Sequence, residues 1–143
     1  MSVIPNADRD IEQACVRYAR ALDTRDWQLL DTVFDTAVSA QYGDQPENHG
    51  RAAVVASIRA FLDACGPSQH LLGNFDIAVI GTTGRSTCYV RVFHQGKGSR
   101  AHLTQETLGT YHAEWHHTTN GWRATKWKLA VSMELGTREA FGS

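Results

Sequence analysis

The sequence has 143 residues, of which 42% are hydrophobic and 20% charged, and its formal net charge is −1 at pH 7. This length is typical of one domain, so we expect residues 1–143 to form a single domain. The near-neutral charge, without a long run of Lys or Arg, excludes nucleic acid and an anionic membrane surface as main partners. No segment holds about 18 consecutive apolar residues, the length that a membrane-spanning helix needs.

The N-terminus and the cysteines indicate a cytoplasmic protein. Residues 1–8 lack the basic flank and the apolar core of a signal peptide. The three cysteines, Cys15, Cys65 and Cys88, are odd in number, widely spaced and free of any CxxC motif. We therefore expect reduced thiols packed inside the protein rather than disulfides or metal ligands.

The first half of the chain has the apolar spacing of helices. A first helix is expected from about Asp8 to Leu22, because its apolar residues recur every three to four positions. A second, short helix is expected over residues 27–34, capped by Asp26, and is followed by a strand over residues 37–42. A third helix is expected over residues 51–65.

The second half of the chain changes to the alternation typical of strands. Three turns separate the strands, and the one at Asn120-Gly121 favours a tight hairpin. The later strands are therefore antiparallel, and the helices pack on one face of a curved sheet, an α+β fold that encloses an interior pocket. The expected strands cover residues 74–80, 86–95, 100–114 and 122–134.

One strand carries a histidine that would face this pocket. The break at Gly66-Pro67 ends the preceding helix, and residues 68–79 suit an extended strand. His70 lies near its start, and alternation places Leu72 on the same face, as an aliphatic wall beside the imidazole. His70 could equally be a core histidine bonded to a backbone carbonyl.

The order of these segments resembles the SnoaL-like branch of the nuclear transport factor two-like superfamily. Four stretches carry the resemblance, which extends over about residues 11–134. They are the end of the first helix (residues 18–23) with residues 27–34, Gly50 leading into the third helix, Gln69-His70-Leu71-Leu72-Gly73-Asn74, and Gly109-Thr110-Tyr111 to Glu114 with Asn120-Gly121-Trp122-Arg123.

The resemblance implies a conical α+β barrel, a strongly curved antiparallel sheet closed by three N-terminal helices. Dehydratase and dehydrochlorinase members of the superfamily use an Asp at the end of the first helix and a His at the start of a strand. Those positions fall on Asp23 and His70. In a bile-acid dehydratase of the superfamily a Tyr and a further polar residue correspond to Tyr18 and to a position near His94.

The last strand departs from the pattern of these relatives. Several members carry an Arg a few residues after the Trp that follows the hairpin, whereas this chain has Trp127 between Lys126 and Lys128. We therefore expect Trp127 to stack on a flatter, more apolar ligand, with His94 and Leu72 also in contact with it.

The three candidate catalytic residues suit proton abstraction from carbon. A carboxylate that accepts a hydrogen bond from one imidazole nitrogen fixes the tautomer and makes the other nitrogen a better base. Asp23 would hold His70 in this way, at a helix end where the dipole does not favour an anion. Tyr18 would donate to a substrate oxygen where charge develops, although it could also be a core tyrosine.

A metal centre is not expected. His112 and His116 have the spacing of a helical zinc pair, but their segment is predicted to be a strand, which would place them about 13 Å apart. No metal and no cofactor is needed for the chemistry above.

The leading hypothesis is a cofactor-independent, dehydratase-like lyase that acts on a small apolar molecule such as a polyketide, steroid or terpenoid. The same base would also serve an isomerase or an aldol-type cyclase. A non-catalytic ligand-binding or dimerisation module is the alternative of another class. A curved sheet exposes a large convex face, so we expect a homodimer or homotrimer.

Overall fold

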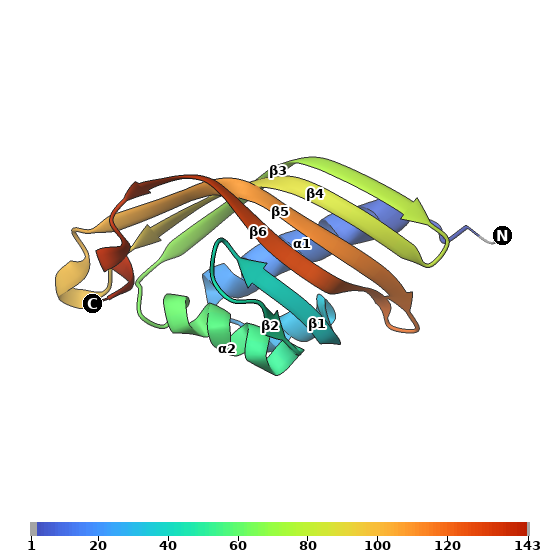
Figure 1. Cartoon of the computed structure of the whole chain (residues 1–143), viewed down its shortest axis with the longest axis horizontal. Coiled ribbons are helices and arrows are strands. Elements are labelled where there is room, and N and C mark those ends of the chain that lie inside the picture. Colours follow the sequence, from blue (N-terminus) through green and yellow to red (C-terminus); the bar gives the residue numbers. More distant parts are fainter. Residues whose placement is uncertain (1–2, 143) are drawn as a thin grey trace.

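The computed structural model describes residues 3–142, and a curved six-stranded sheet arches over the helices (Figure 1). The sheet is formed by β1 (Phe34–Tyr42), β2 (Asn48–His49), β3 (Ser68–Ile80), β4 (Thr83–Gln95), β5 (Thr104–Thr118) and β6 (Gly121–Gly136). The strand order is β2-β1-β6-β5-β4-β3. Neighbouring strands are antiparallel except β1 and β6, which are parallel. The predicted α+β fold, with helices on one face of a strongly curved sheet, is confirmed; the sheet curls without closing on itself.

The longer helices and strands follow one another in the predicted order, whereas a two-residue strand at Asn48–His49 and two short helices at Gly98–Arg100 and Arg138–Phe141 were not expected. The helices are α1 (Ala7–Thr24), η1 (Trp27–Thr32), α2 (Arg51–Leu62), η2 (Gly98–Arg100) and η3 (Arg138–Phe141), of which the three named η are 3-10 helices. Among residues 3–142, no helix has the length and hydropathy of a membrane span.

The second helix is shorter than predicted, because its last residues join the sheet instead. The carbonyl of Val33 accepts a hydrogen bond from the backbone of Ala124 on β6 (2.7 Å), and Phe34 pairs with the same residue in the ladder. Pairing with β6 thus ends η1 at Thr32 and starts β1 earlier than expected.

Bulges bend the long strands over the helices. The pairing of β3 with β4 shifts register between Gly73 and Asp76, where Asn74 adopts a positive φ of 53°. The pairing of β5 with β6 shifts between Leu108 and Gly109. A bulge bends its strand and increases the local twist, so these positions help to form the concave face that covers α1 and α2.

The core lies between α1 and the concave face of the sheet. Its largest buried side chains include Tyr18, Phe34, Trp115 and Trp127. The ring centroid of Trp127 lies 4.3 Å from that of Tyr18 and 5.7 Å from that of Phe34. This aromatic cluster connects α1 with β1, β5 and β6. The three cysteines are free and buried, as expected.

The convex face of the sheet, opposite the core, carries solvent-exposed apolar side chains. They come from β3, β4 and β6 and are between 48% and 61% exposed: Leu71, Tyr89, Phe93, Met133 and Leu135. A face of this kind commonly packs against another molecule. The homodimer or homotrimer expected from the sequence stays a prediction.

The close approach of β5 and β6 at Gly109 can be tested by substitution. A Cβ atom at Gly109 would collide with the backbone carbonyl of Ala130, whereas a Cβ at Gly73 would meet nothing within 4 Å. We expect Gly109→Ala to lower the free energy of unfolding by about 1–3 kcal/mol, and Gly73→Ala to change it by no more than about 0.5 kcal/mol. Urea unfolding of both variants measures the difference, and equal stabilities would contradict the bulge geometry.

Candidate functional site

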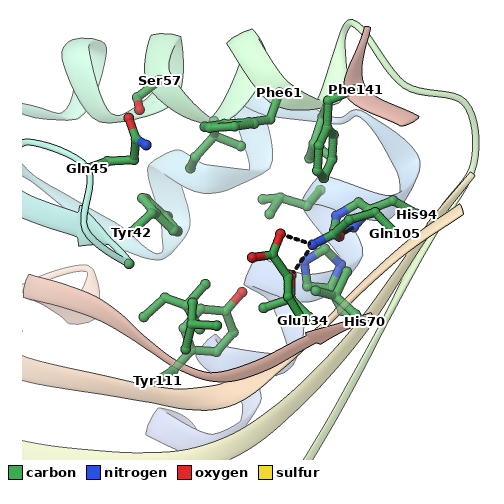
Figure 2. A pocket seen from close by; sticks show the side chains of 18 of the residues that line it. Tyr42, Gln45, Ser57, Phe61, His70, His94, Gln105, Tyr111, Glu134 and Phe141 are labelled. Carbon is green, nitrogen blue, oxygen red and sulfur yellow. Dashed lines mark hydrogen bonds between the residues drawn. The ribbon is translucent and has the colours of Figure 1, made fainter. Parts of the chain in front are cut away.

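A cavity of about 540 Å³ lies between the sheet and the helices. Figure 2 shows Phe61 and Phe141 along one wall, with His70 and His94 gathered at one end. Phe141, from η3, packs edge to face on both Phe61 (5.5 Å) and His94 (4.8 Å between centroids). Aliphatic side chains form much of the remaining wall: Leu22, Ile58, Leu62, Val92, Leu129 and Val131. The cavity therefore suits a largely apolar molecule with a few polar groups.

Asp23, at the end of α1, and His70, on β3, are in direct contact. Oδ1 of Asp23 lies 2.7 Å from Nδ1 of His70, and Oδ2 accepts the backbone N–H of the same residue at 2.8 Å. Because an ionised carboxylate can only accept, Nδ1 is the donor, and Nε2 of the neutral ring keeps a free lone pair. The His70 side chain is only 3% exposed and lines the cavity, while Asp23 sits behind it.

Two residues that the sequence reasoning missed hold Asp23 in place. The Ser68 hydroxyl donates to Oδ1 of Asp23 at 2.9 Å, and Arg25 donates to the Ser68 oxygen at 2.8 Å. Arg25 has a positive φ of 59° at the C-cap of α1, and it also donates to backbone carbonyls at the end of α1 and before β3. Their only signal in the sequence is their place, each two positions from Asp23 or His70.

These contacts decide the charge of Asp23. Burial by itself would raise the pKa of its carboxyl. The hydrogen bonds from the His70 side chain, from the backbone N–H of His70 and from the Ser68 hydroxyl outweigh burial and lower the pKa below its ordinary value. Asp23 is therefore an anion at neutral pH and orients the imidazole.

Three tyrosine side chains meet on the cavity wall. The hydroxyls of Tyr18 and Tyr42 are 2.8 Å apart, and the rings of Tyr18 and Tyr111 are 5.3 Å apart. Burial is the main cause that raises the pKa of all three phenols. They are therefore neutral donors at pH 7. The sequence pointed to Tyr18 alone, although strand alternation places Tyr111 on the inward face of β5.

His94, on β4, begins a chain of hydrogen bonds in the cavity wall (Figure 2). Its Nδ1 lies 2.8 Å from Oε1 of Gln105, whose Nε2 donates to Thr107 at 2.8 Å and to Glu134 at 2.7 Å. Arg138 then donates twice to the Glu134 carboxylate, at 2.8 Å each. Burial lowers the pKa of His94 to about 4, against the opposing hydrogen bond with Gln105, so the ring is neutral at pH 7.

Two residues expected to contact a ligand do not line the cavity. Trp127 is 1% exposed and packs behind Tyr18, and its indole Nε1 has no hydrogen-bond partner among residues 3–142. Leu72 shares a face with His70, as alternation predicts, but packs against the core away from the cavity. Leu129, two positions further along β6, occupies the wall instead of Trp127.

The other histidines do not gather into a metal centre. His112 and His116 lie on β5, in a strand rather than a helix, as expected. Within the described residues, no group of three or more His, Cys, Asp or Glu side chains could hold a metal ion.

Comparisons with known proteins agree with this fold. A family model described as SnoaL-like domain matches residues 6–128. No curated protein matches the sequence. Similar solved structures include a proposed aromatic ring hydroxylase from Novosphingobium aromaticivorans (24% identity, TM-score 0.86, covering 98% of this chain and 99% of that one). A proposed scytalone dehydratase from the same organism has 18% identity, a TM-score of 0.81 and coverages of 90% and 86%. A hexachlorocyclohexane dehydrochlorinase has 10% identity, a TM-score of 0.77 and coverages of 92% and 86%.

The lowered pKa of His94 predicts how stability depends on pH. Between about pH 4 and pH 6.5 the unfolded chain binds a proton at this residue that the folded protein does not, so stability falls as the pH decreases through this range. When the pH decreases from about 7.5 to about 5, the free energy of unfolding of the wild type should fall by about 1–2 kcal/mol more than that of His94→Gln. Urea unfolding at both pH values measures this, with exposed His49→Gln as the control. Equal losses in wild type and His94→Gln would contradict the burial of a neutral His94.

Proposed function

Because the chain belongs to the SnoaL-like domain family, we propose that it is a cofactor-independent lyase of the dehydratase type. The substrate is a small to medium, largely apolar molecule such as a polyketide, steroid or terpenoid. The single observation that carries this proposal is the contact of Asp23 with His70, whose ring lines an apolar cavity. An open cavity beside His70, in place of a filled core, favours catalysis over a purely structural histidine.

The geometry supports a simple elimination. Nε2 of His70 takes a proton from a carbon that an adjacent carbonyl has acidified, and the C–H electron pair becomes the new C=C bond. Asp23 keeps the ring in place and stabilises the imidazolium. Of the hydrogen-bonded hydroxyls of Tyr18 and Tyr42, one donates to the other, and the remaining O–H donates to the substrate oxygen on which negative charge develops. The imidazolium then gives its proton to the departing hydroxyl, which leaves as water, and the free base is restored.

The apolar wall contributes to the same reaction. A substrate that fills the cavity displaces water from it, so the charges that appear during the reaction interact more strongly there than in bulk solvent. Neither a nucleotide nor a metal ion is needed for these steps. The dehydrochlorinase among the similar structures is named for another elimination, and we take this as support for the reaction class.

Substitution of the base and of its partner tests the mechanism. We expect His70→Asn and Asp23→Asn to fold and to lower turnover by about 10²–10⁴-fold, because each removes the positioned base or its orientation. Turnover is measured by mass spectrometry in D₂O on β-hydroxy ketones with polyketide, steroid and terpenoid skeletons. Exposed His49→Asn and Asp76→Asn are the matched controls and should keep full activity.

The same experiment separates the reaction types. Loss of the mass of water indicates elimination, whereas an unchanged skeleton that gains deuterium indicates isomerisation by the same base. Full turnover by both His70→Asn and Asp23→Asn would rule out the mechanism.

A further inference from the structure

The hydrogen-bond chain behind His94 decides which of its nitrogens carries the proton. Arg138 can only donate, and its two hydrogen bonds are the main cause that lowers the pKa of Glu134, so Glu134 is an anion that can only accept. The group facing this carboxylate must therefore be the NH₂ of Gln105, at 2.7 Å. The orientation of the Gln105 amide is fixed as a result, since its two ends are not interchangeable here.

The fixed amide in turn fixes the imidazole. With its NH₂ toward Glu134, Gln105 presents its carbonyl oxygen to His94, 2.8 Å from Nδ1. A carbonyl oxygen only accepts, so Nδ1 carries the proton and Nε2 of the neutral ring carries a lone pair. Among residues 3–142 the one hydrogen bond of the His94 ring is that of Nδ1 with Gln105, and His94 lines the cavity.

We propose that Nε2 of His94 is a dedicated hydrogen-bond acceptor, which selects substrates that carry an O–H or N–H donor close to the reacting carbon. Gln105 and Glu134 are its positioning residues. This inference rests on the proposed function, because it takes the occupant of the cavity to be the substrate.

The substrate donor that binds His94 would also position the substrate relative to the base, His70. The rings of His70 and His94 meet edge to face, with centroids 6.2 Å apart. A ligand hydroxyl bound to His94 would therefore bring a neighbouring carbon toward Nε2 of His70. An ether or ketone oxygen in the same place would leave Nε2 of His94 facing another acceptor, without a hydrogen bond. A ring without a proton on Nε2 cannot protonate a leaving group, so His94 serves recognition.

The tautomer can be read directly by NMR of protein labelled with ¹⁵N-histidine at pH 7. In the wild type we expect His94 to be neutral with its proton on Nδ1. In Glu134→Gln the new carbonyl would face Arg138 and the new NH₂ would face Gln105, so the Gln105 amide would reverse and present its NH₂ to His94. The proton should then move to Nε2. Glu139→Gln makes the same change of charge on an exposed side chain of η3 and should leave the tautomer unchanged.

Selectivity for a donor is measured by calorimetric titration with 4-phenylphenol and its methyl ether, 4-methoxybiphenyl. The wild type and Glu139→Gln should bind the phenol about tenfold more tightly than the ether, the effect of one hydrogen bond in a buried site. In Glu134→Gln this ratio should fall to about one, because Nε2 then carries a proton. Gln105→Met, which removes the amide while conserving volume, is a second variant and should also lower the ratio.

Three results would overturn the inference: a proton on Nε2 of His94 in the wild type, an equal phenol-to-ether ratio in Glu134→Gln and Glu139→Gln, or failure of both probes to bind. The tautomer is measured without a substrate, so it can be wrong while turnover still depends on His70. Conversely, full activity of His70→Asn would contradict the proposed function and leave the expected tautomer intact.

Discussion

The contact between Asp23 and His70 joins the two halves of this molecule. The residues are 47 positions apart, one at the end of α1 and the other at the start of β3. The carboxylate accepts from both the ring and the backbone of His70, so it fixes the side chain and also anchors the strand. Arg25 and Ser68 extend this anchor on the far side of Asp23. The packing of α1 against β3 therefore sets the orientation of the His70 ring.

The sequence predicted the parts of the fold that depend on local periodicity. Strand alternation placed His70 on an inward face, and the helical stripe placed Tyr18 there, because burial in each element follows a short repeat that any window of residues displays. The likeness to SnoaL-like proteins directed attention to Asp23, which its place at a helix end alone would not have marked. These three positions needed only element type and chain order.

Residues whose role depends on register could not be found in this way. Trp127 and Leu129 both face inward on β6, and only the pairing with β5 and its bulges decides which of them reaches the cavity. Glu134 is a charged residue near the end of a strand, a position typical of a solvent-exposed side chain. It nevertheless accepts a hydrogen bond from Gln105 on the neighbouring strand β5. Such contacts join positions distant in sequence, and no spacing along the chain encodes them.

The two walls of the cavity differ in how firmly they are built. One wall is the sheet, where each strand is held by ladder hydrogen bonds on its neighbours. The other includes η3, a single turn capped by Thr137 and held over the ligand space through the contacts of Phe141 with Phe61 and His94. A short terminal turn rearranges at much lower free energy than a central strand. Because Arg138 also ties this turn to Glu134 on β6, a bulkier ligand that displaces η3 would disturb the hydrogen bonds that lead to His94 and leave the contact of Asp23 with His70 unchanged.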